Sequence, residues 1–312
     1  MNKWGAISIC VFSLAVVIAC IDNKTTREVE QTAIQGTLTE AEELPYQLVS
    51  NLDTFNYSIQ LDYKLEKNAK DHTQKDITKI VFSYPIIDTL PQQNAVLDSI
   101  RDRIETLLLQ DGIGQKSAKD LEARMTQFME EYKEHKKEME EFDLPSGNWV
   151  FEMTIDVLLN TPTLMSLKIH KLEFTGGAHA NTWTSYLNLN LKTGEVLSLD
   201  DLFLENYQTE LLAISEAAFK QKVNLDADTN LIETHYEFNA GDFMLPPNFS
   251  IGSTGLHFHY NPYDLGPFAL GAISFKIPYQ KIRSIINTNI LELEPIKYKA
   301  TSPKKESSLE FN

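Results

Sequence analysis

The sequence predicts an α+β protein of two lobes, each an antiparallel sheet packed with helices. Apolar and polar residues alternate from Ile59 to Leu65 and from Trp149 to Leu159, as they do in strands with one buried face. Apolar residues recur every three or four positions from Val96 to Leu108 and from Leu121 to Tyr132, which is the spacing of an amphipathic helix. Because the period changes at 144–147, which read Leu-Pro-Ser-Gly, we place the boundary between the lobes there.

The N-terminal lobe, 51–145, is predicted to hold two strands followed by two helices. After the strand at 59–65, a second strand at 80–84 is expected to stop at Pro85. The break at 111–114, Asp-Gly-Ile-Gly, separates the two helices. Residues 117–120, Ser-Ala-Lys-Asp, resemble a capping box and predict the start of the second helix.

The C-terminal lobe, 146–295, is predicted to be rich in strands. The alternating apolar residues change parity near His170, which predicts a bulge in the second strand. Residues 192–195, Lys-Thr-Gly-Glu, predict a hairpin turn. The other elements expected in this lobe are a helix at 207–223, strands at 256–260 and 273–277, and a short helix around 279–286.

The N-terminus resembles a bacterial lipoprotein signal. Lys3 is a short basic segment, 7–17 is an apolar run too short to span a membrane, and Ala19 precedes Cys20. The resemblance implies a signal peptide at 1–19, acyl chains on Cys20 that bind a membrane, and a location in the cell envelope facing the periplasm or the exterior. We expect 20–50 to be a polar tether and 296–312 a polar tail.

Charge and cysteine content narrow the possible functions. Asp and Glu outnumber Lys and Arg by 44 to 28, which gives a net charge of −16 and disfavours nucleic acid and anionic membranes as partners. A basic or neutral partner is favoured. The two cysteines are Cys10, inside the signal peptide, and Cys20, so we expect no cysteine chemistry in the mature chain.

Three sequence words in the second half carry a resemblance to a known family. They are 174–181 (FTGGAHAN), 189–203 (LNLKTGEVLSLDDLF) and 258–271 (FHYNPYDLGPFALG), followed by Ile277-Pro278-Tyr279. This half resembles the domain of unknown function 3298 family, the extracellular domain of RsiV-type proteins. Through 81–85 and the helix at 94–108, the first half is similar to the PdaC-like domain of unknown function 4163.

The resemblance implies an α+β domain pair outside the cell membrane. In some relatives the pair is a sensor that binds lysozyme, and in others it is a non-catalytic neighbour of a peptidoglycan deacetylase. No catalytic residues accompany the resemblance. Unlike the sensors, this sequence shows no cytoplasmic segment before an uncleaved membrane helix, and unlike the deacetylases it shows no polysaccharide deacetylase module.

Two loops contain the candidate binding residues. Gly176-Gly177-Ala178-His179 is either a backbone nest for an anion or, as we favour, a tight connection in which the glycines supply positive φ. Residues 261–268 combine rigid turn residues with Tyr263 and Phe268, which is typical of a loop that supports a core or presents a binding surface. The candidate binding residues are therefore His179, Tyr263 and Phe268.

Two patterns resemble metal sites, but neither predicts one on its own. His257 and His259 share a strand face and would need His170 or His179 as a third zinc ligand, so two solvent-facing histidines are the simpler interpretation. A second, calcium-like loop would use Asp226, Asp228, Asn230 and Glu237. Leu231 stands where such a loop needs glycine, which favours a plain acidic loop.

Asp200 and Asp201 are also open to two interpretations. Adjacent carboxylates suggest acid/base catalysis, but the run Ser198-Leu199-Asp200-Asp201 favours a helix cap.

The sequence therefore predicts a lipid-anchored, non-catalytic envelope protein without a cofactor that binds a lysozyme-like protein or a peptidoglycan fragment. The alternative is a metal-dependent hydrolase or deacetylase of envelope polysaccharide that uses His179, His257 and His259.

Overall fold

The computed structural model describes residues 45–49, 56–67, 77–88, 95–110 and 118–296. The expected signal peptide, Cys20 and most of the expected tether and tail lie outside these ranges. None of the helices in the described ranges is long and apolar enough to cross a membrane.

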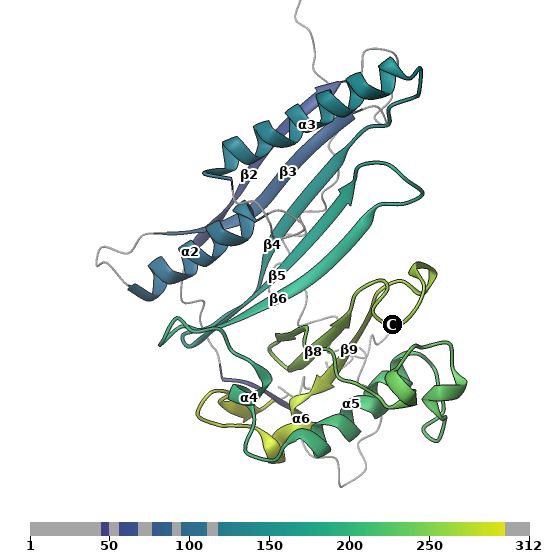
Figure 1. Ribbon diagram of the computed structural model, residues 1–312. Helices are drawn as coiled ribbons and strands as arrows, with labels where there is room; N and C mark the ends of the chain where they lie inside the picture. Colours follow the sequence, from purple (N-terminus) through teal and green to yellow (C-terminus); the bar gives the residue numbers. More distant parts are fainter. Residues whose placement is uncertain (1–44, 50–55, 68–76, 89–94, 111–117, 297–312) are drawn as a thin grey trace, which may run out of the picture. The chain divides into compact units, whose positions relative to one another are not determined.

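A five-stranded sheet occupies the first part of the fold. Its strands, in spatial order, are β2 (Tyr57–Lys67), β3 (Ile77–Ile87), β4 (Val150–Asn160), β5 (Leu164–Phe174) and β6 (Asn181–Asn190). All neighbours are antiparallel except β3 and β4, which are parallel. The helices α2 (Ala95–Leu109) and α3 (Leu121–Glu141) lie between these two strands in the sequence and cover one face of the sheet (Figure 1). They form the long crossover that a parallel pair requires.

The core of this part lies between the sheet and the two helices. Phe82 of β3, Met153 of β4 and Ile100 of α2 are completely buried. The guanidinium of Arg124 in α3 lies over the rings of Phe82 and Phe151, 4.9 and 4.8 Å from their centroids, so a charged side chain is accommodated against aromatic faces.

The start of α3 differs slightly from the predicted capping box. Asp120 is the N-cap residue, and its side chain accepts a hydrogen bond of 2.7 Å from the backbone N–H of Ala123. Ser117, the first residue of the predicted box, lies outside the described residues. A single aspartate therefore caps the helix in the usual geometry.

The predicted lobe boundary at 145/146 does not separate two sheets. Phe82 of β3 lies beside Met153 of β4 in register, so the strands β4, β5 and β6 continue the sheet that β2 and β3 begin. The α+β class is confirmed, but the larger sheet is mixed rather than purely antiparallel. Parallel pairing across two helices leaves no local pattern in the sequence, so a change of period at 144–147 does not mark the end of the sheet.

A smaller antiparallel sheet follows, with strands β7 (Phe249–Ile251), β8 (Gly255–Tyr260) and β9 (Ile273–Pro278). The helix α5 (Gln208–Lys222) packs against it, and the short helices α4 (Leu199–Leu202) and α6 (Tyr279–Ile282) lie nearby (Figure 1). The ring of Phe219 in α5 is completely buried and lies 5.3 to 6.2 Å from five other aromatic rings. Those rings belong to Tyr236, Phe238, Phe243, Tyr260 and Phe275.

The ends of the described chain pair with each other. Strand β1 (Tyr46–Leu48) is antiparallel to β10 (Leu293–Pro295), and the backbone N–H of Leu48 also donates to the carbonyl of Ser253 at 2.8 Å. Residues 46–48 fall inside the tether expected at 20–50. That expectation is therefore wrong for these residues, which are fixed by backbone hydrogen bonds.

Asn188 of β6 joins the two sheets. Its side chain is buried, and its Oδ1 accepts hydrogen bonds from Ser166 of β5 at 2.8 Å and from the N–H of Ile251 in β7 at 3.0 Å. Its Nδ2 donates to the carbonyl of Phe249 at 2.9 Å. One amide side chain thus satisfies backbone groups of β7 that would otherwise be buried without a partner.

Two strand predictions need correction. The bulge expected near His170 lies instead in β4, where the register shifts between Val157 and Leu159. Pro85 does not end β3, which continues to Ile87. The parallel partner β4 pairs only with 79–83, so Pro85 lies where β3 has a single neighbour, and a missing N–H is tolerated there.

Strand β2 is an edge strand with an apolar outer face. Five alternate side chains point away from the helices and are 40 to 56% exposed: Tyr57, Ile59, Leu61, Tyr63 and Leu65. Its polar side chains face the helices instead, and Lys64 pairs with Glu122 of α3 at 2.5 Å. Strand β2 is therefore held to the helices by charge and to the sheet by its pairing with β3.

Candidate functional site

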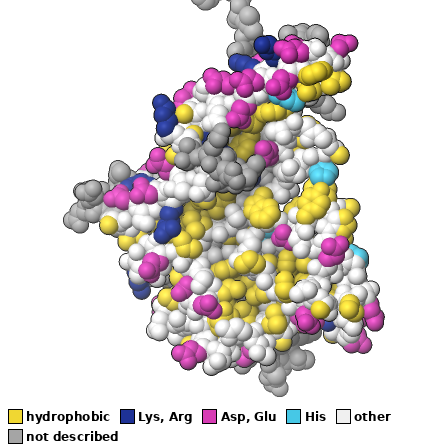
Figure 2. All heavy atoms as spheres, viewed as in Figure 1, with side chains coloured by type: hydrophobic (Ala, Val, Ile, Leu, Met, Phe, Trp, Pro, Cys, Tyr) yellow, Lys and Arg dark blue, Asp and Glu magenta, His cyan; other side chains and the backbone are white. Residues whose placement is uncertain are grey.

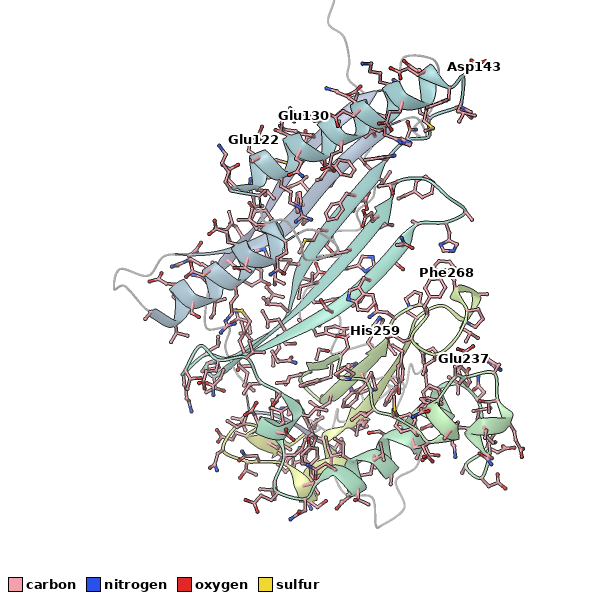
Figure 3. The ribbon with its side chains drawn as sticks, viewed as in Figure 1. Glu122, Glu130, Asp143, Glu237, His259 and Phe268 are labelled. Carbon is pink, nitrogen blue, oxygen red and sulfur yellow. The ribbon has the colours of Figure 1, made fainter. Side chains whose placement is uncertain are left out.

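The three predicted binding residues meet at the surface. The ring of His179 stacks on Phe268, with 3.7 Å between centroids and 5° between planes. The hydroxyl of Tyr263 lies 3.2 Å from Nε2 of His179, and the Tyr263 and Phe268 rings are 5.6 Å apart. Phe268 lies beside the tip of the β5–β6 hairpin (Figure 3). We call His179, Tyr263 and Phe268 the aromatic cluster.

Both ring nitrogens of His179 have polar neighbours. Its Nδ1 lies 3.4 Å from the carbonyl oxygen of Ala180, and its Nε2 faces the Tyr263 hydroxyl. The two loops are thus joined by a hydrogen-bond contact as well as a ring stack.

Backbone conformation shapes both loops. In the β5–β6 connection, Gly176 and Gly177 have φ of 120° and 100°, which fits the interpretation of 176–179 as a tight connection. Tyr263 has φ of 74°, which is unusual for a residue with a Cβ and costs about 1–2 kcal/mol. Its side chain is 59% exposed, so burial does not offset this cost.

A buried asparagine fixes the base of the Tyr263 loop. The Oδ1 of Asn261 accepts from the N–H of Thr184 at 2.7 Å, and its Nδ2 donates to the carbonyl of Thr184 at 3.0 Å. Asn248 bonds the same edge, donating to the carbonyl of Thr184 at 2.7 Å and accepting from the N–H of Tyr186 at 3.2 Å. Two amide side chains thus take the place of a neighbouring strand along the free edge of β6.

His259 positions Asn261. The sequence pattern predicts that this histidine faces solvent, but it is buried. It is 7% exposed, its Nδ1 lies 2.7 Å from Oγ of Ser274, and its Nε2 lies 3.3 Å from Oδ1 of Asn261. Burial lowers the pKa of His259 and so favours its neutral ring, although the hydrogen bond to Asn261 acts in the opposite direction. The histidine therefore belongs to the support of the loop (Figure 3).

The structure does not bring the candidate zinc ligands together. His170 has Thr184 as its partner, with 3.0 Å between Nδ1 and Oγ1, and burial lowers its pKa. His179 and His259 have the partners described above. Within the described residues, no three His, Cys, Asp or Glu side chains form a group that could hold a metal ion.

The segment that resembles a calcium loop contains a 3₁₀ turn. Asn230 caps a 3₁₀ turn at Leu231–Glu233, and its side chain accepts from the N–H of Ile232 at 3.2 Å. Leu231 is 2% exposed and belongs to the core, so it anchors the turn. Asp226, Asp228 and Glu237 are not part of any metal-sized group in the described chain.

Asp201 has the capping role that the sequence favours, whereas Asp200 bonds a tyrosine side chain. Asp201 accepts from the backbone N–H and the hydroxyl of Ser198 at 2.8 and 2.7 Å, which completes a capping box at α4. Asp200 accepts from the hydroxyl of Tyr207 at 2.7 Å. Burial of the Tyr207 hydroxyl, together with this hydrogen bond, raises the pKa of Tyr207 to about 12.

Family models match two parts of the chain. A model described as Protein of unknown function (DUF3298) matches 200–280, and one described as Deacetylase PdaC matches 71–182. The chain contains a DUF3298 domain and a PdaC domain. The PdaC match extends through β4 and β5 into β6, in agreement with the continuous five-stranded sheet. The first resemblance word, 174–181, therefore falls in the PdaC domain, and His179 is contributed by that domain.

Solved structures share the fold. A DUF3298 family member from Bacteroides fragilis aligns with a TM-score of 0.62 and 21% identity, over 76% of this chain and 95% of that one. A DUF3298 family protein from Pseudomonas aeruginosa aligns with a TM-score of 0.56 and 18% identity, over 78% of this chain and 99% of that one. Comparison with curated protein sequences finds no match. The neighbours therefore establish the fold alone.

Sequence reasoning missed the asparagines that support the cluster. Asn188, Asn248 and Asn261 bond backbone groups of distant strands, and such contacts have no periodic signature. The one available signal was that Asn248 follows Pro246-Pro247 and Asn261 precedes Pro262, because proline stiffens the loop from which an amide must reach.

Proposed function

We propose that this chain is a lipid-anchored, non-catalytic binding protein of the cell envelope that recognises a basic, lysozyme-like protein through the aromatic cluster. The observation that carries the proposal is the contact of His179, Tyr263 and Phe268 across two domains. Tyrosine and other aromatic side chains dominate the energy of many protein interfaces.

The cluster has features of a preformed contact surface. Tyr263 combines an exposed side chain with a left-handed backbone, and Asn261 two residues earlier is 3% exposed and fixed to β6. A ring held in place before binding loses little conformational entropy when a partner arrives.

Charge favours a basic partner. The net charge is −16, and acidic side chains are spread over the visible face, with a row along α3 (Figure 2). Such a field speeds encounter with a cation. The lysozyme class comes from the resemblance to RsiV-type sensors, and the anchor comes from the resemblance of the N-terminus to a lipoprotein signal.

Calorimetry with a lysozyme tests the partner. We expect heat of binding at physiological salt and a weaker but measurable affinity at several-fold higher salt, because screening removes the long-range attraction and leaves the ring contacts. Binding that disappears completely with salt would indicate nonspecific attraction. Absence of heat would exclude this partner, and soluble peptidoglycan fragments would then be titrated in its place.

A further inference from the structure

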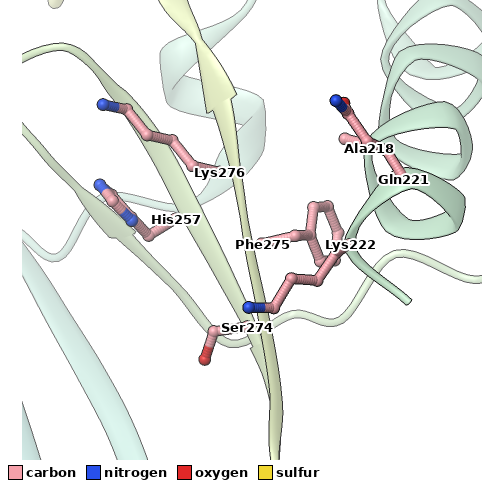
Figure 4. A pocket seen from close by; sticks show the side chains of 7 residues that line it. All are labelled: Ala218, Gln221, Lys222, His257, Ser274, Phe275 and Lys276. Atoms are coloured by element: carbon pink, nitrogen blue, oxygen red, sulfur yellow. The ribbon is translucent and has the colours of Figure 1, made fainter. Parts of the chain in front are cut away.

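A cavity of about 360 Å³ is lined by residues of α5, of the edge strand β9 and by His257 of β8 (Figure 4). Ala218, Gln221 and Lys222 of α5 line one side, and His257, Ser274, Phe275 and Lys276 of the sheet line the other. This volume is within the range of small-molecule sites. The aromatic cluster contributes no residue to it.

The cavity lining is basic, although the protein as a whole is acidic. The chain carries 44 acidic against 28 basic residues, yet the cavity lining contains two lysines and a histidine and no carboxylate. Positive charge in the lining favours an anionic over a cationic ligand.

The side chain of Lys222 is not needed to cap the C-terminal carbonyls of α5. The carbonyls of Phe219, Lys220 and Gln221 already accept hydrogen bonds from the loop amides of 223–225, at 3.0, 2.9 and 3.3 Å. Lys220, by contrast, pairs with Glu216 at 2.8 Å. Among the described residues, Lys222 has no ion-pair partner.

Local contacts position Lys276 and His257 on the sheet side of the cavity. Nζ of Lys276 donates to the hydroxyl of Thr254 at 2.6 Å, which leaves two of its three hydrogens for a ligand. A Cβ at Gly252 would meet the His257 ring at 3.0 Å, so the glycine leaves room for the imidazole. Phe275 and Ala218 add an apolar wall.

We propose that this cavity binds a small organic oxyanion, a carboxylate or phosphate group on a sugar-sized skeleton. Lys222 would contact the oxyanion, Lys276 on the other face of β9 would add positive charge, the amide of Gln221 would supply a further donor, and the wall formed by Phe275 and Ala218 would contact the carbon skeleton. This inference does not depend on the function proposed for the aromatic cluster.

Titration of the full-length chain with glucuronate, glucose 6-phosphate and glucose tests the site. We expect one or both anions to bind and glucose not to bind. The two anions separate a carboxylate source from a phosphate source. Replacing Lys222→Gln and Lys276→Gln together should weaken anion binding at least about tenfold, because the cavity loses both of its lysines.

The matched control replaces Lys192→Gln and Lys281→Gln, which removes the same charge from residues outside the cavity. This variant should bind the anions as the wild type does, and Lys276→Arg should retain binding. Failure of both anions to bind, binding of glucose with equal affinity, or equal weakening in both double variants would overturn the proposal. Thermal melting of each variant confirms that it is folded.

Discussion

The imidazole of His179 and the phenyl ring of Phe268 lie almost parallel, 5° apart, with their centroids 3.7 Å from each other. His179 comes from the PdaC domain and Phe268 from the DUF3298 domain. A surface that requires both domains depends on the contacts that hold their sheets together. Asn261 and Asn248 provide these contacts next to the aromatic cluster.

The conformation of Tyr263 predicts an unusual order of stability among its variants. Tyr263→Gly should be more stable than Tyr263→Ala by about 1 kcal/mol, because only glycine adopts the left-handed backbone without strain. Denaturant unfolding measures the difference. Tyr63 is the matched control, since it is 56% exposed but lies in strand β2. There the glycine variant should be the less stable of the two. An alanine variant at 263 more stable than the glycine variant would contradict the assigned strain.

Asn261 should matter far more to stability than an exposed asparagine. Asn261→Ala removes the partners of the N–H and the carbonyl of Thr184, and we expect a loss of about 3 kcal/mol in the free energy of unfolding. Urea unfolding measures the loss. Asn289→Ala, at an exposed position, should cost less than about 0.5 kcal/mol. Equal effects of the two substitutions would show that water replaces the Asn261 contacts.

Stability should fall at mildly acidic pH. Burial lowers the pKa of His259 and of His170 below 6.5, so the unfolded chain binds more protons than the folded chain as pH falls through that range. The contribution of these two histidines to the free energy of unfolding is therefore fully present above about pH 6.5, and it is lost as the pH falls below that value. Urea midpoints at about pH 7.5 and pH 5.5 measure the change.

His259→Gln removes one of these titrating groups, so its midpoint should fall less between the two pH values than that of the wild type. A midpoint that rises at the lower pH, or falls equally in both proteins, would contradict the role of His259.

Cys20 should determine membrane attachment. Cys20→Ala removes the residue expected to carry the acyl chains, so the variant should leave the detergent phase into which the wild type partitions. Phase separation of cell extracts followed by immunoblotting measures this. Unchanged partitioning of the variant would refute the lipid anchor.

Local pattern in the sequence predicted most elements but not how they combine. The alternation from Trp149 to Leu159 identified β4, because side-chain period reports which face is buried. It could not identify the partner of β4, since the parallel pairing with β3 spans two helices. The aromatic cluster was predictable as two loops rich in glycine, proline and aromatic residues. The buried Asn188, Asn248 and Asn261 were not, because an asparagine in a turn and an asparagine that bonds a distant strand look the same in sequence.

The most direct test of the aromatic cluster compares the affinity of Tyr263→Ala and Tyr63→Ala for lysozyme. Both substitutions remove an exposed tyrosine ring, 59% and 56% exposed respectively, and neither changes the net charge. We predict that Tyr263→Ala weakens binding about 30-fold, the effect of losing a central ring contact of about 2 kcal/mol, and that Tyr63→Ala binds as the wild type does. Equal affinity of the two folded variants would contradict the assignment of the cluster as the binding surface.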